Sequence, residues 1–129
     1  MDWSSRVLVI TGGGGGMGIA ISRLYYSAGA RLALIDINQN SLDVALEEFN
    51  DTDRCIAINT DITKPSKCEK AIQDCINKYG RLDVLINAAG IWIEGNSDEM
   101  TEDDYDRVMN VNLKGALHTL FRTSKRTNY

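Results

Sequence analysis

The chain has 129 residues, of which 43% are hydrophobic and 25% charged, and its formal net charge is −4 at pH 7. This length suffices for one domain with a buried core, and the composition is typical of a soluble α/β protein. Acidic and basic residues are interspersed, which argues against a nucleic-acid or anionic-membrane partner. The longest apolar runs have the length of strands and are too short to span a membrane.

The amino terminus and the cysteines indicate the compartment. Residues 1–6 lack a charged segment followed by an apolar one, so we expect no secretory signal and a cytoplasmic protein. Cys55, Cys68 and Cys75 form no Cys-x-x-Cys pair, and the one histidine, His118, is distant in sequence. These residues predict buried, reduced thiols and no metal site.

Strand and helix patterns alternate along the chain. Apolar runs predict strands at 7–11, 31–36, 55–59 and 82–87. Helical spacing predicts helices at 17–28, from Asn38 to about 49, after Thr63 up to Gly80, and from Thr101 onward. A loop is expected at 92–100 and a polar tail at 122–129. The last helix has an apolar stripe, formed by Tyr105, Val108, Met109, Leu113, Ala116, Leu117 and Leu120.

Four β–α units in strict alternation favour one α/β domain over residues 1–129. Strands that are apolar on both faces suit a parallel sheet with helices on both sides. Right-handed crossovers then predict a doubly wound, Rossmann-like sheet with the strand order 3-2-1-4. A ligand crevice is expected beside the carboxyl ends of the first and fourth strands.

A glycine-rich turn is the most informative segment. Residues 11–18 read Thr-Gly-Gly-Gly-Gly-Gly-Met-Gly, between the first strand and the first helix. A turn without side chains lets a large anion approach the backbone N–H groups and the positive end of the helix, which predicts a dinucleotide pyrophosphate. Ile19 stands where a P-loop would have lysine, which excludes that motif. A flexible turn without a ligand is the plainer alternative.

The spacing within the turn is ambiguous, because five consecutive glycines satisfy more than one motif. Gly13-x-Gly15-x-x-Gly18 fits the general dinucleotide fingerprint, whereas Thr11-Gly12-x-x-x-Gly16-x-Gly18 fits a different spacing. The glycines alone therefore predict a cofactor site without assigning each residue its place.

Asp36 supports a dinucleotide independently, because it ends the second strand 18 residues after Gly18. A carboxylate there can accept hydrogen bonds from an adenosine ribose. It would repel a 2′-phosphate by about 4 kcal/mol at ~4 Å and an effective dielectric of ~20, so we expect NAD in preference to NADP. The alternative is a solvated acid at the end of a strand.

Four motifs in this order resemble the short-chain dehydrogenase/reductase family. They are Thr11-Gly12-x-x-x-Gly16-x-Gly18, Asp61 after the third strand, Asn87-Ala88-Ala89-Gly90 after the fourth strand, and Asn112 in Val-Asn-Leu-Lys-Gly. The resemblance covers essentially the whole chain. It implies an NAD-dependent oxidoreductase that transfers a hydride between nicotinamide and an alcohol or carbonyl substrate.

The resemblance also implies which residues serve the cofactor and the reaction. Asn112 would help to organise the catalytic site, although a purely structural role is an equal alternative. The pyrophosphate would be held by Gly12, Gly14, Gly15, Gly16 and Met17, and the adenosine ribose by Asp36 and Ile37. The adenine would be flanked by Asp61 and Ile62, and the nicotinamide-side ribose would be bordered by Asn87, Ala88, Ala89 and Gly90.

The sequence departs from the family in one essential respect. Family members use a Tyr-x-x-x-Lys pair and an upstream serine for proton transfer, and none of the lysines here has tyrosine four residues before it. We therefore expect the cofactor-binding half of such an enzyme, truncated after the helix that follows the fourth strand. A substrate would bind only if further residues complete the site.

Three functions remain open at this point. The first is an NAD-dependent oxidoreductase represented by an incomplete chain. The second is a non-catalytic module that binds NAD. The third is an interaction protein, because the strand at 82–87 would form an open apolar edge and the stripe on the last helix would lack a partner. Both surfaces predict a homo-oligomer or a partner chain.

Overall fold

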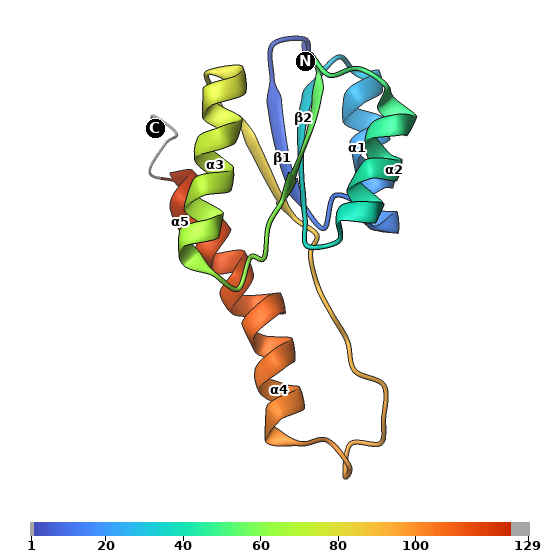
Figure 1. The fold of residues 1–129 in the computed structure, drawn as a ribbon, viewed down its shortest axis with the longest axis vertical. Coiled ribbons are helices and arrows are strands. Elements are labelled where there is room, and N and C mark those ends of the chain that lie inside the picture. The colour runs from blue at the N-terminus through green and yellow to red at the C-terminus, as the bar shows by residue number, and fades with distance from the viewer. Residues whose placement is uncertain (1, 125–129) are drawn as a thin grey trace.

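The computed structural model describes residues 2–124, and it contains a four-stranded parallel sheet between two layers of helices (Figure 1). The strand order is β3-β2-β1-β4, which confirms the predicted topology. The strands are β1 (Val7–Thr11), β2 (Arg31–Asp36), β3 (Cys55–Asn59) and β4 (Val84–Asn87).

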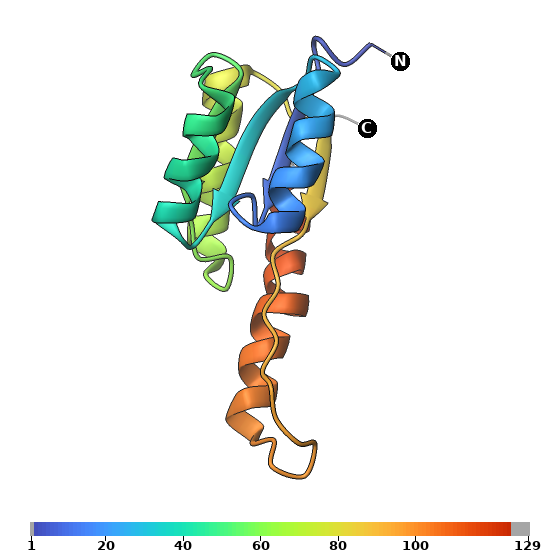
Figure 2. The same ribbon diagram turned by 90° about the vertical axis from the view of Figure 1, so that its right-hand side faces the viewer.

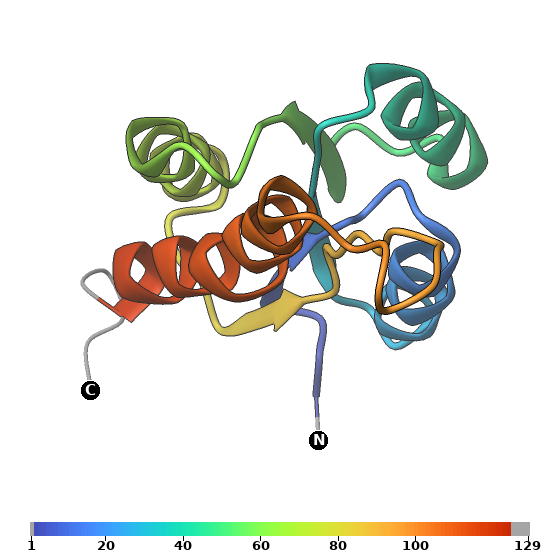
Figure 3. The ribbon, with the colours of Figure 1, turned by 90° about the horizontal axis from the view of Figure 1, so that it is seen from below.

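Helices cover both faces of the sheet. Figure 3 shows α1 and α2 on one side and α3 and α5 on the other. The helical segments are α1 (Gly16–Ser27), α2 (Gln39–Phe49), α3 (Pro65–Tyr79), α4 (Glu102–Met109), the π-helical η1 (Asn110–Gly115) and α5 (Ala116–Ser124). Among the described residues, no helix is both long and apolar enough to cross a bilayer.

Strand β1 is the centre of the core, because it pairs with β2 on one side and with β4 on the other. All five of its residues are buried. Val7 and Val9 pack into the core under α3, whereas Leu8 and Ile10 pack into the core under α2. The continuous apolar run of β1 thus reflects burial on both faces.

Several helix ends follow the local signals that the sequence contains. The Asn38 side chain accepts a hydrogen bond from the Ser41 N–H at 3.1 Å and caps α2. Thr101 and Asp104 form a reciprocal capping box at the start of α4. Gly80 ends α3 with a φ of 74°, a left-handed conformation that glycine adopts without strain.

The region after β4 differs most from the sequence-based expectation. The expected single helix is interrupted by η1, and its sheet-facing side is formed by small residues, Gly115, Thr119 and Thr123. Much of the predicted apolar stripe is exposed instead, with Leu113 at 53% and Tyr105 at 55%. Of the predicted polar tail, residues up to Ser124 are helical and 125–129 lie outside the described residues.

The α4 segment and the loop that precedes it extend away from the sheet (Figure 2). They leave the body beyond the carboxyl ends of the strands, and α5 returns along the sheet beside α3. The loop at 92–100 was predicted correctly. The projection explains why the apolar residues of this helix find few partners within the chain.

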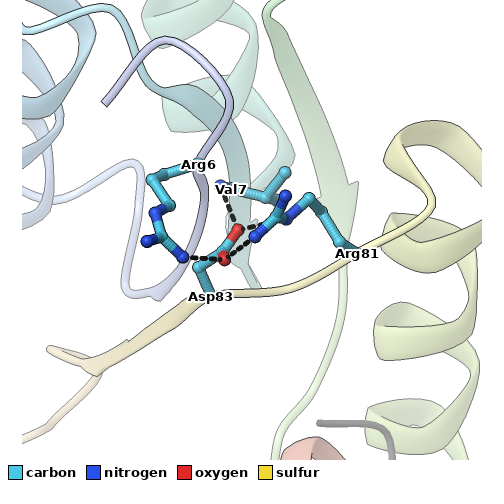
Figure 4. Close-up of polar contacts among 4 residues, drawn as sticks. All are labelled: Arg6, Val7, Arg81 and Asp83. Carbon is cyan, nitrogen blue, oxygen red and sulfur yellow. Dashed lines mark hydrogen bonds and ion pairs between the residues drawn. The ribbon is translucent and has the colours of Figure 1, made fainter. Parts of the chain in front are cut away.

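Asp83 joins the amino-terminal ends of β1 and β4 (Figure 4). Its carboxylate accepts hydrogen bonds from Arg6 at 2.8 Å, from Arg81 at 2.5 and 2.9 Å, and from the Val7 N–H at 2.9 Å. Burial alone would raise the pKa of this carboxyl, but these hydrogen bonds outweigh it and lower the pKa to about 2. Strand β4 begins at Val84, two residues later than predicted, directly after this ion cluster.

The Asp83 cluster generates a prediction about stability and pH. Because its pKa is lower in the folded protein, the carboxylate stabilises the fold above pH ~4 and this contribution is lost as the pH falls toward 2. We expect Asp83→Asn to reduce the free energy of unfolding at pH 7 by about 1–2 kcal/mol. This value is smaller than the pKa shift alone would give, because solvent screens the two half-exposed arginines.

Urea denaturation at pH 7 and pH 3 measures this effect. The difference in the free energy of unfolding between Asp83→Asn and the wild type should be smaller at pH 3. Asp98 is an exposed acid of the loop, so Asp98→Asn should leave the free energy of unfolding unchanged at both pH values. An Asp83→Asn variant as stable as the wild type at pH 7 would contradict the prediction.

Candidate functional site

The turn after β1 is held by close backbone contacts. Gly12 has a φ of 67°, and a Cβ atom there would lie 2.9 Å from the carbonyl oxygen of Ala88. A Cβ atom on Gly18 would lie 2.1 Å from the carbonyl oxygen of Gly12. Both positions therefore require glycine for the fold itself, because the turn packs against the segment after β4 and against its own helix.

Gly16 differs from these two glycines. A Cβ atom there would meet no atom within 4 Å, so packing within the chain does not require glycine. Gly16 is the first residue of α1, and the preceding Gly15 provides no side-chain cap. The amino terminus of α1 thus combines uncapped N–H groups with open space, a combination that suits an anion.

Asp36 lies beside this turn, at the end of β2. One carboxylate oxygen accepts a hydrogen bond from the Gly14 N–H at 3.0 Å, and the other accepts one from the Asn38 N–H at 3.0 Å. The side chain is half-buried at the rim of the site. Its carboxylate has further acceptor positions for hydroxyl groups of a ligand.

Asp61 follows β3 and faces the same region. Its carboxylate accepts hydrogen bonds from the hydroxyl of Thr63 at 2.7 Å and from the Thr63 N–H at 2.9 Å. The hydroxyl contact lowers the pKa of Asp61 more than partial burial raises it, so the group is ionised at neutral pH. Ile62 is buried and packs under η1, where a Cβ atom on Gly115 would lie 2.7 Å from its Cδ1.

A cavity of about 260 Å³ joins these segments at the carboxyl ends of β1, β2 and β4. Its position confirms the predicted crevice. Predicted site residues that line it are Gly12, Gly15, Asp36, Ile37, Asp61, Ile62, Ala88, Ala89 and Gly90. Residues that sequence reasoning missed are Ile35, Thr60, Thr63, Ile91 and Val111.

Sequence reasoning missed these residues for two different reasons. Ile35, Thr60, Thr63 and Ile91 are direct neighbours of predicted residues, so the strand ends could have identified them. Val111 comes from η1, and the sequence carries no clear signal for that change of helix geometry.

The remaining predicted residues lie outside this cavity. Gly14 and Gly16 line a second hollow of about 460 Å³ between α1 and α2. Arg23 lines this hollow too, but Glu48 accepts two hydrogen bonds from its guanidinium. Met17 lines neither hollow, and its side chain is 70% exposed.

Asn87 is directed toward α5 and not into the cavity. Its side-chain oxygen accepts a hydrogen bond from the Thr119 hydroxyl at 2.6 Å, and its amide donates to the Ala116 carbonyl at 3.4 Å. Nearby, the Ala89 N–H donates to the Thr11 hydroxyl at 3.2 Å. These contacts fix where the segment after β4 passes the end of β1.

Asn112 holds the next stretch of the same segment. Its side-chain oxygen accepts a hydrogen bond from the Ile91 N–H, and its amide donates to the Ile91 carbonyl, both at 2.8 Å. Asn112 lies in η1, and π-helical turns are frequent at functional sites. The structure therefore shows a positioning contact for this residue.

The three cysteines are buried and unpaired, as predicted. Burial raises the pKa of both Cys55 and Cys75 to about 12, so these thiols are protonated and unreactive at neutral pH. Within the part of the chain that the structure describes, no three His, Cys, Asp or Glu side chains gather as metal ligands.

Comparison with known proteins agrees with this geometry. A family model described as short chain dehydrogenase matches residues 6–125. An NAD-dependent glycerol dehydrogenase from Listeria innocua is 34% identical over 113 residues, which are 88% of this chain and 44% of that protein.

Solved structures show the same fold. A short-chain dehydrogenase/reductase from Brucella melitensis superposes with a TM-score of 0.94 at 29% identity, over 99% of this chain and 54% of that one. A 3-ketoacyl-(acyl-carrier-protein) reductase from the same organism, complexed with NADH, superposes with a TM-score of 0.89 at 25% identity. The superposition covers 94% of this chain and 50% of that one.

The chain spans about half the length of the curated relatives it matches. The matched half contains the glycine turn, the acids after β2 and β3, and the segment after β4, which is the part of the fold described above. On this match and this geometry, the chain belongs to the short-chain dehydrogenase family of NAD(P)-dependent oxidoreductases.

Proposed function

We propose that this chain binds NAD and forms the cofactor-binding part of an oxidoreductase that transfers a hydride between nicotinamide and an alcohol or carbonyl substrate. The open space at Gly16, next to the uncapped start of α1, carries this proposal. Packing explains glycine at Gly12 and Gly18 but not at Gly16, where an anion bound at the start of α1 would account for it.

The turn fits a pyrophosphate in shape and in charge. Backbone N–H groups and the positive end of α1 offer hydrogen bonds and a favourable potential to an anion. Gly12, Gly14, Gly15, Gly16 and Met17 would hold this group; Met17 would contribute through its backbone, since its side chain is exposed.

The adenosine half would lie against the ends of β2 and β3. Asp36 and Ile37 would contact the ribose, and Asp61 and Ile62 would flank the adenine, because these residues line one cavity. Asp36 has acceptor positions left for ribose hydroxyls, and its charge disfavours a 2′-phosphate. The names of the Listeria dehydrogenase and of the reductase complexed with NADH are in line with this choice of cofactor.

The nicotinamide half would lie along Asn87, Ala88, Ala89 and Gly90. Asn87 is directed toward α5, so we propose that the backbone of the next three residues borders this ribose. Asn112 would act on the site by holding Ile91 in place, which makes it a positioning residue here.

Bound NAD would supply the hydride acceptor, whereas these residues bind and orient it. The sequence has no tyrosine four residues before a lysine, so we propose that the chain alone binds cofactor without converting an alcohol or a ketone. Residues beyond this chain would complete the substrate site in the whole protein.

The first prediction compares three glycines. Gly16→Ala should weaken NADH binding roughly tenfold without lowering stability, because the methyl group enters the space meant for the ligand. Gly18→Ala should lower stability, since its Cβ atom would collide with the Gly12 carbonyl. Calorimetry with NADH and thermal unfolding measure the two effects.

Gly95→Ala is the matched control, because its Cβ atom also meets open space but lies in the distant loop before α4. It should leave both measurements unchanged. If Gly16→Ala bound NADH as tightly as Gly95→Ala, the space at Gly16 would not belong to the cofactor.

A second prediction concerns cofactor choice. NADH should bind at least about tenfold more tightly than NADPH, because Asp36 repels the added phosphate, although solvent at this half-exposed rim weakens the repulsion. Titration of the chain with each cofactor measures the ratio. Equal affinities would argue against the proposed place of Asp36 beside the ribose.

We also propose that the chain associates with a second copy or with a partner, because two apolar surfaces lack cover. The first consists of exposed side chains on η1 and α5, namely Leu113, Leu117, Leu120 and Phe121. The second is the outer edge of β4, which pairs with no strand among the described residues. Open strand edges and apolar patches both promote association.

Light scattering at increasing concentration tests this association. We expect particles larger than a monomer for the wild type and a shift toward monomer in Phe121→Glu, which places a charge in the first surface. Leu24→Glu serves as control for the first surface, because Leu24 is 72% exposed but lies on α1. A wild-type monomer at all concentrations would refute association with a second copy.

A further inference from the structure

We infer that Asp36 is also a positioning residue for the glycine turn: its carboxylate holds the turn in the shape that receives a pyrophosphate. This inference depends on the proposed function only because that function names the anion as a pyrophosphate. The hydrogen bond from the Gly14 N–H to Asp36 Oδ2, at 3.0 Å, is the observation that carries it.

The turn depends on hydrogen bonds because it has no side chains of its own between Gly12 and Gly16. The Gly13 N–H donates to the Ile35 carbonyl, and the Gly15 N–H donates to the Gly12 carbonyl, both at 3.0 Å. Among the hydrogen bonds of the described residues, Asp36 supplies the side-chain contact to this turn. The other contacts to the turn come from backbone carbonyls.

This contact matters because glycines lose more conformational freedom on ordering than other residues. A hydrogen bond to an ionised carboxylate is stronger than one to a neutral carbonyl. The bond from Gly14 to Asp36 is therefore expected to restrain the turn more than its bonds to backbone carbonyls do.

Asp36 also connects the turn to α2. Its second oxygen accepts a hydrogen bond from the Asn38 N–H at 3.0 Å, and the Asn38 side chain caps α2 at Ser41. Gly14 lies directly against this first turn of α2, where a Cβ atom on Gly14 would come within 2.7 Å of the Ser41 Cβ. The carboxylate thus joins the turn after β1 to the start of α2.

The positioning role and a ribose contact are compatible. Each carboxylate oxygen offers two acceptor positions, and the backbone occupies one on each oxygen. Ribose hydroxyls can use the remaining positions while the turn stays held. A substitution of Asp36 that is meant to admit a 2′-phosphate would, however, also release the turn.

The two roles predict opposite effects on a probe that lacks ribose. If Asp36 only contacts the ribose, removal of its negative charge should leave the affinity for inorganic pyrophosphate unchanged or raise it, because the anions repel each other. If Asp36 positions the turn, the same change should lower this affinity. The sign of the effect therefore distinguishes the roles.

The experiment measures inorganic pyrophosphate binding and backbone amide exchange by NMR in the wild type and in Asp36→Ala. We expect roughly tenfold weaker pyrophosphate binding and roughly tenfold faster exchange of the Gly14 amide in the variant. Glu47→Gln removes one negative charge from an exposed position on α2, so it should change neither the pyrophosphate affinity nor the exchange rate of the Gly14 amide. Unchanged or tighter binding to a folded Asp36→Ala would overturn the inference.

Asp36→Asn keeps the test valid if Asp36→Ala does not fold. Asparagine has an NH2 group in place of one carboxylate oxygen, and its remaining oxygen is a neutral, weaker acceptor, so protection of the Gly14 amide should fall between those of Asp36→Ala and the wild type. Protection equal to that of the wild type in a folded variant would count against the inference. Failure of the wild type to bind pyrophosphate and NADH would overturn the proposed function, while Gly14 exchange would still decide the positioning role.

Discussion

The approach of α1 to the carboxyl end of β1 is the constraint on which the rest of the site depends. The Gly12 carbonyl occupies the place that a side chain on Gly18 would take, so the helix begins directly behind the turn. Gly12 in turn lies against Ala88, and this contact brings the segment after β4 to the same place. Where the turn and residues 88–90 border the cavity, their residues are glycine or alanine, which leave space beside β1.

Charges are distributed unequally between the two ends of the sheet. At the carboxyl ends, Asp36 and Asp61 satisfy part of their hydrogen-bonding capacity with nearby groups of the turns and remain beside the cavity. At the amino-terminal ends, Asp83 is paired with two arginines and buried between β1 and β4. The first two acids line the cavity, where we propose that they meet a ligand, whereas the third stabilises the sheet.

The order of the strands and most helix boundaries followed from the sequence, because apolar periodicity and end signals such as Asn38 and Gly80 act locally. Asp36 and the segment after β4 could likewise be placed at one edge of the sheet. The turn of Asn87 toward α5 could not be predicted, since it depends on the Thr119 hydroxyl, 32 residues away. Nor could η1, where Gly115 packs against Ile62 from a distant part of the chain.

The central place of β1 has a consequence for the order in which the protein can form during synthesis. Its partner β2 follows within one helix, but its other partner, β4 (Val84–Asn87), is synthesised only after about two thirds of these 129 residues. Until then, one edge of a strand that is fully buried in the folded protein stays unpaired on the nascent chain. The central strand of the sheet thus has an open edge that can pair with other chains while translation continues.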